Sequence, residues 1–254
     1  MSTITIRNNV AAAGVAAIAL LAGGSPAYAA ETAAAPQHHH PSPSHFTQGR
    51  VTNPYYPQKP GTGLIYRGTT DGEPSRDVLV ATHRTRVIDG VRCRVLFDRL
   101  FVKGVLTERT RDYYAQTKRG TVWYFGEKTA ELDEDGHVTS REGSFLSGRD
   151  GAEAGIFMPA HPRVGQAFHQ EDYPGHAEDR FVVKSLDASV STPYVGSQHA
   201  LLTAERSALE PGVVEHKRYV RGIGDVADSD VRGGSDHQKL WAIRHRSGTT
   251  YGPH

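Results

Sequence analysis

The chain has 254 residues, 29 lysines and arginines against 28 acidic residues, and a single cysteine. A balance this close to neutral gives no electrostatic attraction for nucleic acid or anionic membrane, so the composition argues against both as partners. One cysteine excludes an intrachain disulfide, and the fold must therefore be held by its hydrophobic core.

Residues 1–29 have the pattern of a secretory signal peptide. Arg7 supplies the positive start, residues 10–22 the apolar run, and Ala27-Tyr28-Ala29 the small residues before a cleavage site. The apolar run is short and rich in Ala and Gly for a membrane span. The cleavage site has no cysteine that could carry a lipid anchor. We therefore expect a soluble, secreted (extracellular) protein with no stable membrane insertion.

Residues 30–48 are predicted to be a disordered linker, because they are rich in Ala, Pro and Ser and show no apolar period. Histidine tracts bind Zn, Cu or Ni, but without a scaffold their geometry is not held. We expect loose, adventitious metal binding here and no built metal site. The histidines of this segment are His38, His39, His40 and His45.

Residues 49–247 are predicted to form a single β-rich domain. Prolines and tyrosines at 53–57 favour an extended lead-in. Short runs rich in β-branched and aromatic residues then alternate with turn signals, of which Asp89-Gly90 is a strong hairpin signal. The predicted strands span 63–68, 76–83, 85–88, 91–101, 105–116, 121–127, 128–132, 137–142, 168–173, 177–186, 198–207, 213–220 and 240–246.

No stretch shows a long helical period. Residues 200–209 are also compatible with a helix, and we predict a strand there from the neighbouring pattern. Many short strands without β–α alternation predict a mainly β fold, a curled antiparallel meander or partly open barrel with a concave face. Such a sheet must close, pair with a second sheet or be covered to bury its apolar face.

The hairpin over residues 105–127 contains the densest aromatic cluster and several acids. If the turn spans the four residues 117–120, every second side chain of the two strands would point to the same face of the hairpin. Two carboxyls among aromatic rings can raise one pKa and make a general acid–base pair. The alternative is a wet rim, where these acids pair with Arg109, Arg111 or Lys128. The residues expected on the shared face are Glu108, Asp112, Tyr114, Trp123, Phe125 and Glu127.

A second hairpin is expected over residues 169–180, turning at Pro174-Gly175. His169 would lie opposite Arg180, and Glu171 opposite Glu178, on an outer face that we expect to form an exposed charge ladder. The alternative is a metal site on this face, made by His169, His176, Glu171 and Glu178, although their spacing matches no defined zinc pattern. The inner face would carry polar groups among apolar ones, which need partners or a ligand. Its residues are Phe168, Gln170, Asp179, Phe181 and Val183.

The long loop at 144–165 interrupts the meander, and such loops are often functional. Its apolar part, 155–160, contains Met158 and is expected either to line the mouth of the concave face or to plug the core.

Motif searches by spacing find no nucleophile elbow, phosphate-binding glycine loop, dinucleotide fingerprint or defined zinc pattern. No cofactor is therefore expected. Cys93 alternates with apolar residues and is predicted to be a buried small hydrophobe.

The order of motifs resembles a family of exported bacterial β-proteins without an assigned reaction, the TapB-like group. The resemblance implies a curled sheet related to the LolA-like lipoprotein carriers, which hold apolar ligands on a concave face. This chain departs from many relatives in lacking the lipid-anchor cysteine, and Phe145 stands where similar sequences tend to have Trp. The matching stretches are NPYYP (53–57), DYYAQ and VWYFGE (112–127), DGAEAGIFMPAHPRVG (150–165), QEDYPGHAED (170–179) and PGVVEHKRYVRGIGDV (211–226).

Three functions remain open. The first is a secreted protein that binds an amphiphilic small molecule in the concave pocket. The second is a cofactor-independent enzyme, a hydrolase or an isomerase or cyclase, that uses paired carboxylates in the same pocket. The third is a cell-envelope interaction protein with exposed sheet edges. The candidate catalytic residues are Asp112, Glu127, Asp179 and Glu171; the candidate ligand-binding residues are Tyr114, Trp123, Phe125, Gln170, Phe181 and Met158.

Overall fold

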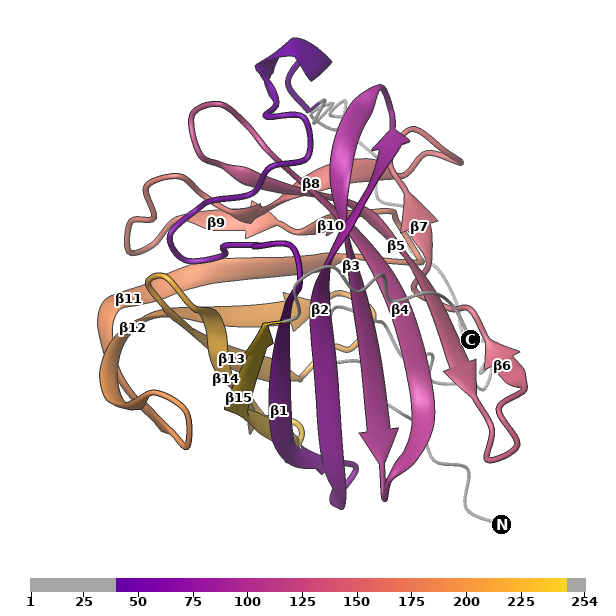
Figure 1. Cartoon of the computed structure of the whole chain (residues 1–254), viewed down its shortest axis with the longest axis vertical. Coiled ribbons are helices and arrows are strands. Elements are labelled where there is room, and N and C mark those ends of the chain that lie inside the picture. Colours follow the sequence, from indigo (N-terminus) through magenta and orange to yellow (C-terminus); the bar gives the residue numbers. More distant parts are fainter. Residues whose placement is uncertain (1–39, 246–254) are drawn as a thin grey trace, which may run out of the picture.

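The computed structural model describes residues 40–245 (Figure 1). The predicted signal peptide, residues 30–39 of the predicted linker and residues 246–247 of the predicted domain lie outside this range. Among the described residues, no helix has the length and apolar character needed to cross a membrane.

The described elements are one short 3₁₀ helix and the strands of a single 15-stranded sheet. They are η1 (Pro43–His45), β1 (Thr62–Thr70), β2 (Glu73–Ile88), β3 (Val91–Val102), β4 (Val105–Gln116), β5 (Val122–Leu132), β6 (Val138–Ser140), β7 (Phe145–Leu146), β8 (Glu153–Met158), β9 (Ala167–His169), β10 (Glu171–Asp172), β11 (Asp179–Thr192), β12 (Gly196–Ser207), β13 (Val214–Val220), β14 (Gly224–Arg232) and β15 (His237–His245).

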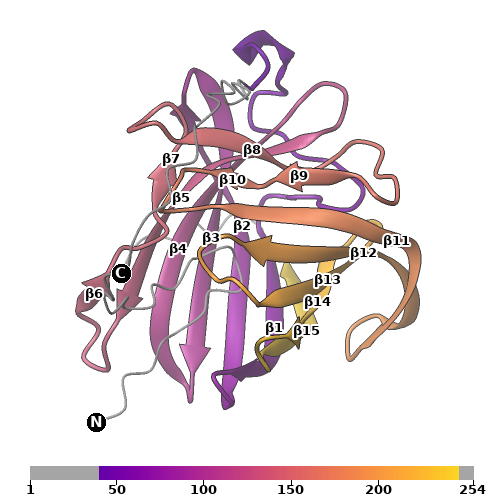
Figure 2. The ribbon, with the colours of Figure 1, turned by 180° about the vertical axis from the view of Figure 1, so that it is seen from behind.

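The strands pair antiparallel in the order β10-β8-β5-β4-β3-β2-β1-β15-β14-β13-β12-β11-β9, with β6 and β7 paired to β5 off this path. The sheet curls until it is nearly closed into a barrel with one open seam (Figures 1 and 2). The prediction of a mainly β, curled antiparallel fold is confirmed. Residues 200–209 lie largely in β12, so the strand predicted there is confirmed as well.

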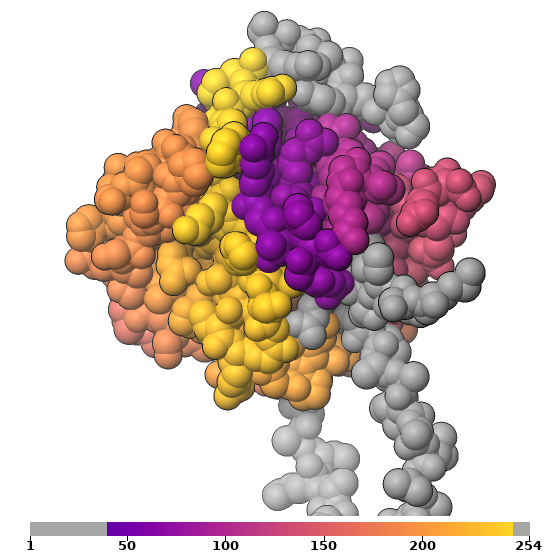
Figure 3. All heavy atoms as spheres, turned by 90° about the horizontal axis from the view of Figure 1, so that it is seen from below, coloured from indigo at the N-terminus to yellow at the C-terminus, as the bar shows by residue number. Residues whose placement is uncertain are grey.

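Two sets of long-range strand pairings complete the sheet. β1 pairs with β15 from Thr62 opposite His245 to Thr69 opposite His237, which sets the N-terminal strand beside the C-terminal one (Figure 3). At the seam, β9 pairs with β11 and β10 with β8, and only Gln170 separates β9 from β10. The segment 167–172 therefore touches both edges of the sheet.

Tight two-residue turns link the first four strands. Ile88 pairs with Val91 across Asp89-Gly90, as predicted, and both turn residues have positive φ, 47° and 72°. This is the type I′ geometry that matches the right-handed twist of the strands.

β14 was missed by sequence reasoning. Its inward-facing residues include Asp225 and Asp228, and aspartate is depleted in strands. The sequence therefore has no apolar alternation to signal this strand, and its pairing with β13 and β15 is a tertiary outcome.

Both faces of the curled sheet contribute to the core. Inside the barrel, rings pack on one another: Tyr114 stacks on Tyr124 with centroids 4.6 Å apart, and Tyr56 and Phe157 lie 4.4 Å apart. A smaller cluster lies on the outer face of β2–β5 and includes the buried Cys93, as predicted. The apolar part of the loop 144–165 was expected either to line the mouth of the concave face or to plug the core. The strand β8 in this loop fills the interior, with Met158 only 1% exposed, so it plugs the core.

Residues 40–48 differ from the disordered linker expected for them. Phe46 is 1% exposed and lies 5.5 Å from Phe125, centroid to centroid, on the outer cluster. His40 Nε2 lies 2.9 Å from Asp89 Oδ2, and its Nδ1 lies 2.8 Å from the Pro41 carbonyl oxygen. One aromatic ring and one ordered histidine thus fix a segment whose composition indicated disorder.

The register of the β4–β5 hairpin also differs from the prediction. Gln116 pairs with Val122 and Tyr114 with Tyr124, because the loop spans five residues and closes with the Thr117 amide donating to the Thr121 carbonyl oxygen. A shift of one residue exchanges the faces of a strand. Trp123 and Phe125 therefore join the outer cluster, and Tyr124 takes the inner position.

A bulge at Gly126 then returns Glu127 to the inner face, where it was predicted to lie with Asp112. Asp112 pairs directly with Glu127, although Tyr114 pairs with Tyr124, so β5 has one extra residue over this interval. Gly126 has φ +124°, and a Cβ there would lie 2.2 Å from the Phe145 carbonyl oxygen. The bulge places Tyr124 and Glu127 on the same face.

We expect Gly126→Ala to lower the free energy of unfolding by roughly 3 kcal/mol or more, since it combines backbone strain with a backbone clash. Urea denaturation measures this loss. Gly136→Ala is the matched control, because Gly136 also has positive φ (82°) but nothing within 4 Å of its Cβ position, and its loss should be about 1 kcal/mol. Equal losses at the two positions would contradict the importance of the bulge.

Candidate ligand-binding site

The acid pair predicted from the hairpin lies on the inner face and is fully buried. Asp112 and Glu127 are both 0% exposed, so the wet-rim alternative does not hold. The Tyr124 hydroxyl oxygen lies 2.8 Å from Asp112 Oδ1 and 2.9 Å from Glu127 Oε2. Both carboxyl groups thus converge on one phenol.

This geometry requires a carboxyl proton. A phenol has one proton to donate, and it cannot donate to two acceptors at full strength. The second contact becomes a hydrogen bond only when the other carboxyl is protonated and donates to the phenol oxygen. Burial raises the pKa of Asp112 to about 8, with a further contribution from the charge of Asp98. Burial and the neighbouring Asp112 also raise the pKa of Glu127 well above its usual range.

The pair continues into a chain of buried hydroxyl groups. The Thr129 hydroxyl donates to Glu127 Oε1 at 3.0 Å, and its oxygen lies 2.9 Å from that of Thr110. The Thr110 hydroxyl lies 3.0 Å from Glu108 Oε1. Six side chains on β4 and β5 therefore form one hydrogen-bonded line from Asp112 to Glu108.

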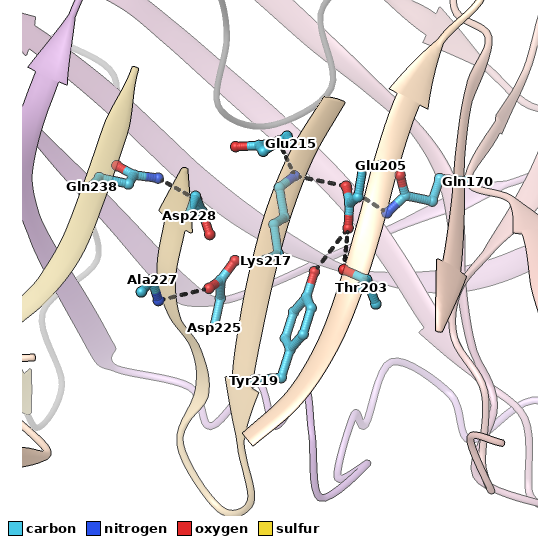
Figure 4. A network of polar contacts seen from close by, with 10 residues as sticks. All are labelled: Gln170, Thr203, Glu205, Glu215, Lys217, Tyr219, Asp225, Ala227, Asp228 and Gln238. Carbon is cyan, nitrogen blue, oxygen red and sulfur yellow. Dashed lines mark hydrogen bonds and ion pairs between the residues drawn. The ribbon is translucent and has the colours of Figure 1, made fainter. Parts of the chain in front are cut away.

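The opposite wall of the barrel carries a second network, built around a buried lysine (Figure 4). Lys217 Nζ lies 2.9 Å from Glu205 Oε2 and 3.3 Å from Glu215 Oε2. The neighbouring carboxylates raise the pKa of Lys217 well above its usual value despite its burial. Within segment 40–245, Lys217 is the one cationic side chain that is fully buried, while the interior holds many acids.

The second predicted hairpin is confirmed in part. His169 pairs with Arg180, and Phe168 with Phe181, as expected. Glu171, however, pairs with Ala154 of β8 and is 1% exposed, so it is not part of an outer charge ladder. Burial, then the charge of Asp179, raise the pKa of Glu171. Burial raises the pKa of Asp179 to about 6.

The structure separates the predicted ligand-binding residues into two groups. Tyr114, Phe181 and Met158 belong to the inner cluster, and Gln170 donates to Glu205 across the interior. Trp123 and Phe125 belong to the outer cluster and cannot contact a ligand inside the barrel. The register shift of the hairpin is the reason for this error.

A cavity of about 280 Å³ opens at the end of the barrel where β1 begins and β15 ends. We call it the mouth pocket. Its walls come from β1, β2, β3 and β15, and its rim from residues 56–59, the β13–β14 turn and the tip of the β11–β12 hairpin. The lining residues are Tyr56, Pro57, Gln58, Lys59, Thr62, Leu64, Leu79, Ala81, Leu96, Tyr194, Gly222, Ile223, Gly224, Asp225, Ile243 and His245.

Gln58 is the unusual residue of the mouth pocket. Its side chain is 4% exposed, and neither Nε2 nor Oε1 has a hydrogen-bond partner among the described residues. The backbone around it is well held: the Gln58 amide donates to the Val51 carbonyl oxygen at 3.1 Å, and the Gly61 amide to the Ala81 carbonyl oxygen at 2.8 Å. A fixed backbone thus holds this carboxamide buried and unpaired in the wall beside the cavity.

Two nearby carboxamides, in contrast, have hydrogen-bond partners. Asn53 Nδ2 donates to the carbonyl oxygens of Gly120 and Pro159, and its Oδ1 accepts from the Tyr55 amide. Gln116 Oε1 accepts from the amides of Thr52 (2.6 Å) and Asn53 (2.7 Å). Buried polar groups normally find partners in this way. Sequence reasoning missed Gln58, because a glutamine after YYP has no motif or period that marks it.

The one group of possible metal ligands found in residues 40–245 is Asp133, Asp135 and His137, in the turn after β5. Asp133 Oδ1 accepts from the amides of Asp135 and His137, which is an ordinary turn arrangement. The turn is largely exposed, so these contacts describe a capped turn and do not define a metal centre.

We expect the pH dependence of stability to report the buried acid at Asp112. Because its folded pKa of about 8 exceeds the usual value of 3.8, its protonation stabilises the fold below about pH 4, and this contribution is lost as pH rises towards 8. Through Asp112 alone, the free energy of unfolding should fall by on the order of 1 kcal/mol per pH unit in this window. Glu127, Glu171 and Asp179 also have raised pKa values and add to the total slope. Asp112→Asn should therefore make the total slope shallower by about this amount, as measured by urea denaturation at several pH values.

The control for this test is Glu134→Gln, which removes a carboxyl group at an exposed turn position. An Asp112→Asn variant with the full wild-type slope between pH 4 and pH 8 would contradict a protonated Asp112.

We expect Gln58→Leu to raise the free energy of unfolding by about 1 kcal/mol, because it removes an unpaired buried amide and keeps the apolar volume. Gln116→Leu should lower it by about 2 kcal/mol or more, since it leaves two backbone amides unpaired. Denaturant titration of both variants measures the contrast. A loss of stability in Gln58→Leu would mean that this amide is already satisfied.

Comparisons with known proteins add little to this geometry. No model of a known protein family matches the chain, and no curated protein matches it, so the resemblance to the TapB-like group stays a prediction. Two solved structures are similar over most of their length. One, described as an exported protein with a YmcC-like fold from Bacteroides fragilis NCTC 9343, has a TM-score of 0.42 and 12% identity, and covers 75% of this chain and 98% of that one.

The other, described as a lipoprotein from Parabacteroides distasonis ATCC 8503, has a TM-score of 0.41 and 10% identity, and covers 77% of this chain and 100% of that one. Both TM-scores are low, so the likeness supports no statement about what this chain does.

Proposed function

We propose that this is an exported β protein that binds an amphiphilic small molecule in the mouth pocket. The observation that carries the proposal is a cavity of about 280 Å³ whose lining includes Leu64, Leu79, Leu96 and Ile243 together with the charged residues Lys59 and Asp225. An apolar cavity with a few convergent polar groups is the usual design of a small-molecule site.

The walls of the mouth pocket suit an apolar ligand body. Leu64, Leu79 and Leu96 come from three neighbouring strands, and Ile243 of the next strand, β15, pairs directly with Leu64. Liquid water occupies about 30 Å³ per molecule, so the cavity has room for a ligand of on the order of ten non-hydrogen atoms. This favours a small amphiphile over a long-chain lipid.

The enzyme hypothesis receives less support from the geometry. Asp112 and Glu127 have no exposed surface, and their hydrogen bonds run to Tyr124 and Thr129. A general acid or base must reach the reacting atom directly or through one water. These acids could do so only after movement of the packed strands around them, whereas the mouth pocket is open without such movement.

The proposal predicts that 1-octanol binds at a single site and that Ile243→Trp abolishes this binding. The indole ring would occupy the cavity beside its apolar wall and leave no room for the ligand. Isothermal titration calorimetry of the purified full chain measures the affinity, and thermal unfolding with and without 1-octanol gives a second reading.

Val231→Trp is the matched control, because Val231 is 50% exposed and does not line the mouth pocket. It should bind 1-octanol like the wild type. Absence of binding to the wild type, or unchanged binding to a folded Ile243→Trp variant, would refute the proposed site.

A further inference from the structure

The barrel wall formed by β15 and β1 to β5 collects cationic side chains on its outer face (Figure 1). Successive side chains of a strand point to opposite faces, so the sequence neighbours of the buried Tyr66, Leu96 and Asp112 point outward. The outward cations are exposed or half-buried. We call them the basic face: Arg67, Arg76, Arg99, Arg109, Arg111, Lys128 and Lys239.

The acids of the same strands are segregated on the inner face. Asp77, Asp98, Glu108, Asp112 and Glu127 are each at most 7% exposed. Burial raises the pKa of each of these acids, so they carry less negative charge near neutral pH than a count from the sequence assigns to them. The near-neutral balance of the whole chain therefore does not describe the charge of the basic face, and it does not exclude an anionic partner there.

Several cations of the basic face lie directly opposite one another. Arg67 pairs with Arg76 on one side and with Lys239 on the other, and Arg111 pairs with Lys128. Like charges directly opposite in a sheet lower stability. Among the described residues, none of these five side chains forms an ion pair that would offset the repulsion. Folding alone gives no reason for this arrangement, whereas an anionic partner does.

Aromatic rings accompany the arginines of the basic face. The Arg67 guanidinium carbon lies 4.2 Å from the centroid of the Trp241 ring, and that of Arg76 lies 4.3 Å from the Phe101 centroid. Trp241 is 46% exposed, and Trp is enriched where proteins meet the headgroup region of a membrane. A guanidinium already occupies one face of each ring, which disfavours the base stacking that single-stranded nucleic acid requires.

The extent of the basic face suits a surface better than a linear polymer. Its six adjacent strands, about 4.8 Å apart, span roughly 24 Å across the sheet. The cations also lie at several heights along the strands, because Arg99 pairs with Arg109 while Arg111 lies two residues further along β4. The charges therefore form a two-dimensional array.

We propose that the basic face is a docking surface for an anionic membrane, where lipid phosphate groups bind its arginines and lysines and Trp241 contacts the headgroup region. Arginine suits this role because its planar fork can donate two parallel hydrogen bonds to one phosphate. The association is peripheral and reversible. It does not depend on the mouth pocket, so either proposal can fail without the other.

Co-sedimentation with lipid vesicles tests this proposal. The purified full chain is mixed with vesicles of phosphatidylcholine alone, or of phosphatidylcholine with roughly one third of the anionic phosphatidylglycerol. The protein should bind only the vesicles that contain the anionic lipid. Binding should be lost between about 0.1 M and about 1 M salt, because the Debye length falls from about 10 Å to about 3 Å.

A double variant, Arg67→Gln with Arg76→Gln, should weaken vesicle binding about 25-fold, since each cation near an anionic surface contributes a factor of about five. It should stay folded because it removes a like-charge repulsion. The matched control is Arg180→Gln with Arg206→Gln, an exposed and directly opposed arginine pair on β11 and β12, across the barrel (Figure 2). This control should bind like the wild type.

Thermal unfolding establishes that each variant is folded. If the first double variant does not fold, Lys128→Gln with Lys239→Gln should show the same loss of binding. Equal binding to vesicles with and without anionic lipid, or equal loss in the β11–β12 control, would overturn the proposal. Binding to polyphosphate or DNA without binding to vesicles would also overturn it, in favour of a soluble polyanion, and so would the absence of any binding.

Discussion

The closure of one long antiparallel sheet upon itself is the constraint on which the rest of this structure depends. A sheet of this length cannot bury its apolar face while flat. It therefore curls until its two edges meet at the segment 167–172, which pairs with β11 through β9 and with β8 through β10. Closure creates an interior that side chains from distant parts of the chain must fill together. The ring cluster of Tyr56, Tyr114, Tyr124 and Phe157 fills one part of that space.

The remaining interior is polar to a degree that the curled sheet makes possible. Acids from β2 to β5 face acids from β12 to β14, and Lys217 is the fully buried cation found between residues 40 and 245. Isolated buried carboxylates are expensive, so these groups share protons or donate to one another. The bulge at Gly126 matters here because it places Tyr124 where a single phenol joins Asp112 and Glu127. A buried network of this kind is favourable only when nearly every member is satisfied.

Gln58 is buried with both polar atoms of its carboxamide unpaired among residues 40–245. The carboxamides of Asn53 and Gln116 have partners: Asn53 bonds to backbone groups, and Gln116 accepts from two backbone amides and donates to the Thr52 hydroxyl. An unpaired buried carboxamide costs folding stability. It lies in the wall of the mouth pocket, for which we propose the binding of a small molecule.

The sequence by itself determined the fold class, the hairpin at Asp89-Gly90, the burial of Cys93 and the proximity of Asp112 to Glu127. These follow from local turn chemistry and from alternation along single strands, both of which act over a few residues. Only the tertiary structure decided which face Trp123, Tyr124 and Phe125 occupy, because one more loop residue reverses a strand and one bulge reverses it again. It also decided the strand β14 and the packing of Phe46, whose local sequence favours neither. The mouth pocket was beyond sequence reasoning for the same reason, since its walls come from strands such as β1 and β15 that are far apart in the chain and meet only in the folded sheet.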